Sequence, residues 1–172
     1  MNGIMRLLLF SFAVLMVAVP RASAQSKAEN PAGVKSLEFF NGDWHCDGKF
    51  SNGKEISARL RFELVLDGKF ILFKHDDEPP FSYHAHAYWG WDQAAGQFVA
   101  TVHDSTGGTR LFRSSGWQGT TLNWLGGDLP ASANQRFTFE RLKEKKFVVS
   151  YSYLKNDSWV SVDSSVCTAT SK

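Results

Sequence analysis

The sequence predicts an all-β protein, an antiparallel up-and-down barrel of about ten strands, behind a cleaved leader. Three observations lead to this fold class. Short runs of alternating apolar and polar residues follow one another along the chain, turn-forming residues separate them, and no segment has a long 3.6-residue period. Half-buried antiparallel strands joined by hairpins are typical of such a barrel or of a sandwich.

The first 24 residues have the three parts of a secretory signal peptide. Arg6 supplies a positive charge, residues 7–19 form an almost wholly apolar run, and residues 22–24 form a small-residue cleavage site. The apolar run is too short for a comfortable membrane span. We therefore expect an exported protein, periplasmic or extracellular, with no stable membrane insertion after the leader is cleaved.

The rest of the chain predicts a flexible lead-in at 25–36 and a single barrel domain at 37–172. The lead-in is small, polar and contains Pro and Gly. The chain has 19 Lys and Arg against 17 Asp and Glu, and Arg6 and Arg21 leave with the leader, so the mature chain is formally neutral. A neutral domain without a cluster of basic residues gives no support for nucleic-acid binding. The sequence does not define an oligomeric state.

The strands follow from the alternation and from the turns between them. In residues 55–65, apolar side chains occupy every second position between Ser, Arg and Glu. The segment GVKSLEFF is the exception, because a short helical turn fits it. The expected strands are 43–50, 55–65, 69–77, 81–91, 97–105, 109–115, 120–125, 134–141, 146–154 and 158–169.

Cys46 and Cys167 are the two cysteines of the chain. Export to an oxidising compartment makes their pairing the expectation. They fall in the first and last expected strands, which are neighbours in a closed barrel. Antiparallel neighbours lie about 4.5–5.5 Å apart at Cα, within reach of a disulfide. In the chain-entropy model, a bond across so long a loop contributes on the order of 4–5 kcal/mol.

Four segments resemble the blocks of known barrel families. FFNGDWHCDGKF resembles the Gly-x-Trp start of lipocalin-like barrels. LDGKFILFKHDD, YWGWDQAAGQFVATVHDSTGG and GWQGTTLNW resemble the small bacterial domains of unknown function designated DUF1579. The resemblance covers roughly residues 37–168. It implies a calycin-like barrel with an internal pocket, related to the ten-stranded nitrobindin-type barrels, and brings no established reaction with it.

Two features of the related families are missing from the sequence. Nitrobindin-type haem proteins use a His in a late strand as axial ligand, whereas the last His here is His103, so haem is not an expected cofactor. Lipocalins often cover the N-terminal Trp with an Arg from the last strand, and no Arg follows Arg141.

Three of the five histidines lie within one expected hairpin. A four-residue turn with glycine at positive φ places Asp92 opposite Gln97. The same register places His86 directly opposite His103, with His84 two residues along on the same face. Three clustered imidazoles suit a divalent metal site, and they also suit a barrel enzyme with His86 or His103 as general base.

The other face of this hairpin is more apolar and predicts the barrel interior, which leaves the histidines half solvated outside. Its aromatic residues are Tyr83, Trp89, Trp91 and Phe98. Asp104 points the same way. A carboxylate in such surroundings has a raised pKa unless it is paired, and Arg113 or Arg110 is the expected partner.

The aromatic content indicates a site for an apolar or amphipathic small molecule. The chain has six Trp, four Tyr and 14 Phe, and pockets for apolar molecules are lined mainly by such side chains. We expect Asp104 and Arg113 to orient the ligand. The expected aromatic contacts are Trp44, Tyr83, Trp89, Trp91 and Phe98.

Two further alternatives remain open. The segment KHDDEPP at 74–80 predicts a solvated loop whose prolines end a strand, although its oxygens also suit a cation. The sequence lacks the common hydrolase, zinc-protease, phosphate-loop and dinucleotide motifs, so no catalytic residues are assigned with certainty. A structural or accessory envelope protein is the last alternative, and it predicts a packed barrel with an apolar patch outside.

Overall fold

The structure is a computed structural model that describes residues 33–170. The expected leader at 1–24 and the lead-in as far as residue 32 lie outside these residues. The described elements are η1 (Gly33–Phe40), β1 (Gly42–Phe50), β2 (Glu55–Val65), β3 (Phe70–Asp77), β4 (His84–Asp92), β5 (Gln97–Asp104), β6 (Thr109–Ser114), β7 (Trp117–Gln118), β8 (Thr121–Gly126), η2 (Pro130–Ser132), β9 (Gln135–Lys143), β10 (Lys146–Lys155) and β11 (Ser158–Ala169).

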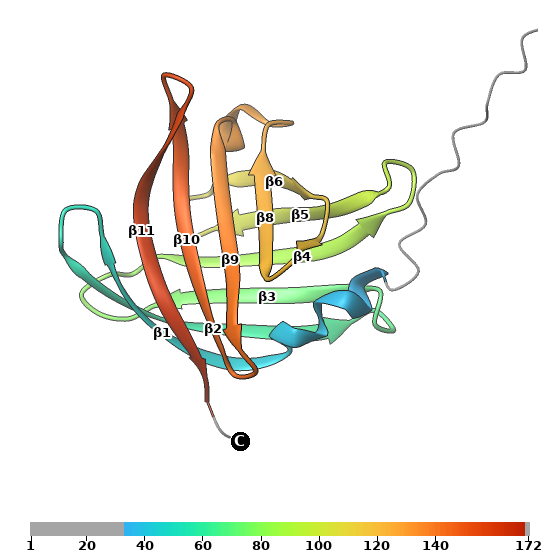
Figure 1. The fold of residues 1–172 in the computed structure, drawn as a ribbon, viewed down its shortest axis with the longest axis horizontal. Coiled ribbons are helices and arrows are strands. Elements are labelled where there is room, and N and C mark those ends of the chain that lie inside the picture. Colours follow the sequence, from blue (N-terminus) through green and yellow to red (C-terminus); the bar gives the residue numbers. More distant parts are fainter. Residues whose placement is uncertain (1–32, 171–172) are drawn as a thin grey trace, which may run out of the picture.

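The strands form one closed antiparallel barrel (Figure 1). Neighbours along the chain pair from β1 to β6 and from β7 to β11. The first and last strands, β1 and β11, also pair, and β6 pairs with β8 to close the wall. Because β7 has only two residues, ten strands make up the wall. The predicted up-and-down barrel is therefore confirmed, and every expected strand agrees with an observed one to within three residues at either end.

The β4–β5 hairpin has the predicted register. Asp92 lies opposite Gln97 and His86 lies opposite His103. Gly96 has a φ of 65°, a conformation that glycine adopts without steric cost. The Asp92 carboxylate accepts hydrogen bonds from the backbone N–H groups of Ala94 and Ala95, which stabilises the turn.

The helix η1 fills one end of the barrel. Its apolar residues Val34, Leu37 and Phe40 recur at helical spacing and are buried. The expected helical turn is thus present. It begins at Gly33, within the stretch 25–36 that the sequence predicts as a flexible lead-in. The ring of Phe40 lies 5.1–5.6 Å from the rings of Phe62, Trp89, Trp117, Phe139 and Phe147.

An arginine covers this closed end from a strand other than the last. The Arg141 guanidinium, on β9, lies 4.2 Å from the ring centroid of Phe39 and 4.5 Å from that of Trp117. Phe39 in turn packs against Trp44, with 5.7 Å between ring centroids. A cation over aromatic faces is attracted to them, so Arg141 stabilises the packing of η1 on the barrel.

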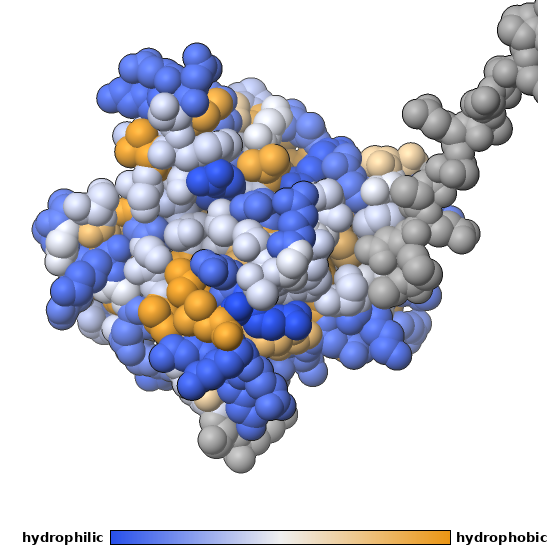
Figure 2. All heavy atoms as spheres, in the orientation of Figure 1, coloured by the Kyte–Doolittle hydropathy of each residue, from blue (hydrophilic) through white to orange (hydrophobic). Residues whose placement is uncertain are grey.

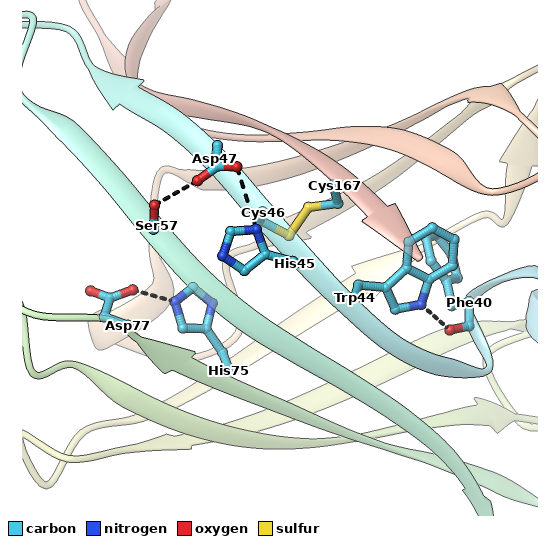
Figure 3. The surroundings of a disulfide bond; sticks show 9 residues. All are labelled: Phe40, Trp44, His45, Cys46, Asp47, Ser57, His75, Asp77 and Cys167. Atoms are coloured by element: carbon cyan, nitrogen blue, oxygen red, sulfur yellow. Dashed lines mark hydrogen bonds and ion pairs between the residues drawn. A yellow bond between two sulfur atoms is a disulfide. The ribbon is translucent and has the colours of Figure 1, made fainter. Parts of the chain in front are cut away.

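The predicted disulfide joins the first and last strands (Figure 3). Cys46 on β1 is directly opposite Cys167 on β11, with Cα atoms 4.0 Å apart. Both residues are buried. Two residues earlier, the Trp44 Nε1–H donates a hydrogen bond of 2.7 Å to the Phe40 carbonyl, which connects η1 to the same strand.

The outer surface mixes hydrophilic and apolar residues. Figure 2 shows separate apolar patches with hydrophilic atoms between them on the face where β10 and β11 lie in front. Val166 on β11 and Trp159 in the same strand are among the exposed large apolar residues. Over residues 33–170, none of the helices has the length and apolar character needed to cross a membrane.

Candidate ligand-binding cavity

A cavity of about 460 Å³ lies inside the barrel, toward the end opposite η1. Phe50, Ile56 and Phe81 line it, at the end of β1, the start of β2 and the β3–β4 loop. The helix η1, in contrast, leads into the start of β1. The barrel therefore has a filled half and a hollow half, and its interior is not completely packed by its own side chains.

The deep wall of the cavity is aromatic. Its main residues are Phe73, Trp89, Phe112, Trp124, Phe137 and Phe139. Small side chains at Ala58, Ala85 and Ala100 leave the space between the rings. A volume of this size is typical of small-molecule sites, which range over about 300–1,000 Å³.

One group of polar side chains in the cavity is built around Arg110 on β6. Its guanidinium Nη2 donates a hydrogen bond of 2.8 Å to Asp104 Oδ2 and another to the Tyr83 hydroxyl. The Arg110 and Asp104 side chains are only 15% and 5% exposed. Asp104 was predicted to need a partner, and Arg110 rather than Arg113 is that partner.

Asp104 also organises the β5–β6 turn. Its Oδ1 accepts hydrogen bonds from the Thr106 hydroxyl, the Thr106 N–H and the Gly108 N–H, at 2.5, 3.0 and 3.1 Å. These bonds, with the charge of Arg110, lower the pKa of Asp104 below its usual value against the opposing effect of burial. Asp104 is therefore a turn residue and an ion-pair partner rather than a free carboxylate.

A second polar group comes from β3 and β11. His75 Nε2 lies 2.6 Å from Asp77 Oδ1 (Figure 3), and the Asp77 side chain is only 7% exposed. Asp163 lines the same cavity from β11. The pKa of Asp163 is raised to about 6, mainly by burial and in part by the charge of Asp77, while His75 and the Tyr151 backbone oppose the rise. The cavity therefore contains Asp163, to which the sequence gives no role, together with His75 and Asp77 from the segment 74–80.

Both tyrosines of the cavity, Tyr83 and Tyr151, have pKa values raised mainly by burial. The charge of Arg110 lowers both values in part, and Asp163 raises that of Tyr151. Tyr151 lies directly opposite Asp163 in the β10–β11 pair, and its ring stacks on Phe137 at 4.9 Å. Tyr151 thus lies between the arginine and the aspartate.

The predicted histidine cluster lies on the outside of the barrel. His84, His86 and His103 are all exposed, because Ala85 and Ala87 alternate with them and point inward. His84 Nδ1 lies 2.8 Å from Asp76 Oδ1, and His103 Nδ1 lies 3.1 Å from Thr109 Oγ1. In the part of the chain from 33 to 170, no group of three or more His, Cys, Asp and Glu side chains is placed to hold a metal ion. The inward orientation that the enzyme alternative required of His86 and His103 is not found.

Of the seven residues predicted to bind a ligand, Tyr83 and Trp89 line the cavity. Asp104 reaches it through Arg110. Trp44, Trp91 and Phe98 pack elsewhere in the core: Trp44 bonds to the Phe40 carbonyl, and the Trp91 ring packs on Phe98 at 4.9 Å. These three do not line the cavity.

Arg113 is separated from the cavity by the alternation of β6. Phe112 and Ser114 on either side of it are buried, and Arg113 instead pairs with two acids on the outer surface. Its Nη1 lies 3.4 Å from Asp92 Oδ2, and its Nε donates to Asp128. The inward arginine is Arg110, two residues earlier, so the predicted polar contact was placed on the wrong arginine.

His75 and Asp77 belong both to the expected strand 69–77 and to the segment 74–80, for which the sequence favours a solvated loop over a cation site. The strand interpretation holds as far as Asp77, and Ile71, Phe73, His75 and Asp77 point inward along β3. The signal was present as an unbroken period of two, in which His75 and Asp77 share a face with Phe73. The strand ends at Asp77, before the prolines, as predicted.

The chain matches no family model and no curated protein. Among solved structures it is similar to a de novo designed fluorescence-activating β-barrel, with 12% identity, a TM-score of 0.40, and 79% of this chain and 97% of that chain covered. It is also similar to EF1p2_mFAP2b bound to DFHBI, with 6% identity, a TM-score of 0.41, and 80% and 98% covered. Both scores are below 0.5, so the barrel is established by this chain's own strand pairing.

Proposed function

We propose that this chain is an exported β-barrel that binds an amphipathic small molecule. The observation that carries the proposal is the cavity of about 460 Å³, which combines aromatic walls with charged groups on three strands. Such a combination suits a ligand with an apolar body and a polar end. The apolar body would lie between Trp89 and Phe112, and the polar end near Asp163 and Tyr83.

The export part of the proposal rests on the predicted leader and on the disulfide. A bond between Cys46 and Cys167 fits an oxidising compartment. The DUF1579 resemblance is compatible with the same picture and is retained as part of this proposal.

Aromatic burial supplies the driving force for binding. At about 25 cal/mol per Å² of apolar surface, a ligand that buries roughly 200 Å² gains on the order of 5 kcal/mol before the costs of association are subtracted. The polar groups of the cavity then determine which ligands bind well. A ligand must supply hydrogen-bond partners for them, because a buried polar group without a partner costs free energy on either molecule.

Native mass spectrometry tests the proposal directly. The protein is expressed with its own leader, purified, and weighed before and after denaturation. We expect an additional mass of a small organic molecule that is lost on denaturation. A bare, disulfide-bonded chain that also fails to bind any apolar probe contradicts the proposal.

A cavity-filling variant provides a matched control. Val102 lines the cavity from β5, whereas Val99 in the same strand lies opposite Arg113 on the other face. Val102→Phe should remove the additional mass by occupying the ligand's space, and Val99→Phe should keep it. Loss in both variants would indicate a general defect in folding rather than a blocked cavity.

A barrel enzyme is the second candidate, and His75 is the residue that favours it. Among residues 33–170, His75 is the histidine that lines the cavity. Its bond to Asp77 orients the ring, as in many general bases. The recovered molecule, incubated with fresh protein, should then be converted to a product. His75→Gln should abolish conversion and keep the bound mass.

The envelope-accessory alternative receives no support from the interior. It predicts a barrel filled by its own side chains, whereas half of this barrel contains the cavity. The exposed large apolar residues come from several strands, β4, β8, β9, β10 and β11, and on the face drawn in Figure 2 hydrophilic atoms separate the apolar patches.

A further inference from the structure

The charged groups of the cavity are out of balance. Asp77 and Asp163 line the cavity, and a third carboxyl group, that of Asp104, binds Arg110 from behind it; these three face one guanidinium and one imidazole. Arg110 is already bound to Asp104 and Tyr83, and His75 is already bound to Asp77. Even with His75 protonated, the cavity keeps one negative charge in excess, and Asp163 is the carboxyl group left over.

Regular alternation along β11 directs Asp163 into the cavity, because it shares its face with Ser165 and the buried Cys167. The register of the β10–β11 pair shifts between Tyr151 and Ser152, so that Tyr151 lies opposite Asp163 and Ser152 opposite Ser161. Val162 is the extra residue, and both Val162 and Asp163 line the cavity. Bulges are common next to binding sites. Here the bulge lies directly beside Asp163 and brings the neighbouring Val162 to the cavity as well.

The neighbours of Asp163 leave it without a cation. From β3 it faces His75 and Asp77, from β10 it faces Tyr151, and Arg110 on β6 lies farther along toward Tyr83. The strand β1, next to β11, contributes Gly48 and Phe50, which carry no charge. In the described chain, no Lys, Arg or His side chain forms an ion pair with Asp163.

We propose that the ligand carries a protonated amine, which Asp163 binds inside the cavity beside the ring of Tyr151. This inference rests on the proposed function and specifies its ligand class. An ammonium group restores the charge balance, forms a charge-assisted hydrogen bond with the carboxylate, and gains from the adjacent aromatic face. A carboxylate ligand would instead add a further negative charge.

Three probes of one size test the inference. Naphthalen-1-ylmethanamine, naphthalen-1-ylmethanol and 1-naphthoate share the same apolar body and differ in the charge of one group. Trp89 and Trp124 line the cavity and report binding by fluorescence. At pH 7.5 we expect the amine to bind about tenfold more tightly than the alcohol, and the carboxylate to bind most weakly.

Asp163→Asn should abolish the preference for the amine, because the amide carries no charge to pair with an ammonium group. The matched control is Asp157→Asn, in the β10–β11 turn of the same hairpin, where Asn also tolerates the positive φ of 59°. In the control the preference for the amine should persist. Thermal unfolding of both variants verifies that they are folded.

The pH profile of the wild-type protein is a second measurement that needs no variant. Asp163 has a raised pKa of about 6 in the free protein, whereas the amine stays protonated between pH 5 and 8. The affinity for the amine should therefore fall below about pH 6 as Asp163 takes up a proton. The affinity for the alcohol should stay constant.

The outcomes separate the inference from the proposed function. Equal affinity for amine and alcohol overturns the amine inference and leaves the small-molecule proposal intact. Preference for the carboxylate also overturns it and indicates that Arg110 is the deciding charge. Failure of all three probes, together with a bare chain in native mass spectrometry, contradicts the proposed function itself.

Discussion

Asp104 and Asp163 both face the barrel interior, and their pKa values shift in opposite directions. The Asp104 carboxylate accepts hydrogen bonds from the turn and from Arg110, so its charged form is favoured. For Asp163 burial outweighs the opposing effects of His75 and of the Tyr151 backbone, so its neutral form is favoured. One carboxyl group therefore supports the fold, while the other is available for a ligand.

Replacing Asp163 by Asn should stabilise the protein at alkaline pH. Its pKa in the folded state is about 6, above the ordinary value of 3.8 for an aspartate. Ionisation therefore opposes folding, with a cost that is absent below about pH 4 and complete above about pH 6. Asp163→Asn should raise the free energy of unfolding by about 1–3 kcal/mol at pH 8, and by less at pH 5. Urea unfolding at both pH values measures this, and an equal gain at both would contradict the argument.

Asp104→Ala should destabilise the protein, because it leaves Arg110 buried without its ion-pair partner and removes the turn bonds. We expect a loss of about 2–4 kcal/mol in the free energy of unfolding. The comparison variant is Asp128→Ala, which removes the exposed partner of Arg113. Exposed pairs contribute about 0–1 kcal/mol to the free energy of unfolding. Similar losses in the two variants would therefore show that the buried Arg110–Asp104 pair stabilises the fold no more than an exposed pair does.

At the scale of single elements, alternation predicts the strands and even the β4–β5 register. It succeeds because the two faces of a strand differ so clearly in polarity. Shifting the strand register by two residues leaves each side chain on the same face, whereas a shift of one residue would expose Ala87 and Trp89 and bury His86. Alternation misses Asp163, because the valines of the run 158–169 occupy the even positions, so hydrophobic alternation places Asp163 outside. In the structure Val160 and Val166 are exposed, and Asp163 shares the inward face with Cys167.

The seam between β1 and β11 depends on a close approach at Gly48. A Cβ atom placed there would lie 2.2 Å from both the Ser164 carbonyl oxygen and the Ser165 Oγ. Gly48→Ala should therefore force the two strands apart and cost about 1–3 kcal/mol. Gly127→Ala is the matched control, because a Cβ atom at Gly127 meets open space. Chemical unfolding measures the stability of both variants. Equal stabilities would show that β1 and β11 can move apart at Gly48 without a loss of stability.

At the scale of the whole molecule, the sequence distinguishes inside from outside but does not give the height of a residue along the barrel axis. Trp44, Trp91 and Phe98 are all packed into the core, as predicted, yet they do not reach the hollow half. Which half is hollow depends on where η1 packs, and that depends on contacts between Phe40 and four distant strands. The alternation of apolar and polar residues along the sequence therefore does not predict which end of the barrel is hollow.

The disulfide should contribute strongly to the stability of the whole barrel. Cys46 and Cys167 are 121 residues apart in sequence, so the chain-entropy model gives on the order of 4–5 kcal/mol. The double variant Cys46→Ala/Cys167→Ala should therefore unfold at a lower urea concentration and keep the same far-ultraviolet circular dichroism. A spectrum without strand signal would show instead that the bond is required for folding.

Covalently, the folded chain is a ring that contains nearly the whole barrel. Backbone and disulfide together form a closed circuit from Cys46 to Cys167, and every hairpin loop of the barrel lies within it. A single cut by a protease in any of these loops opens the circuit without releasing a fragment. A molecule nicked once should therefore migrate as one band on a denaturing gel, and as two bands only after reduction.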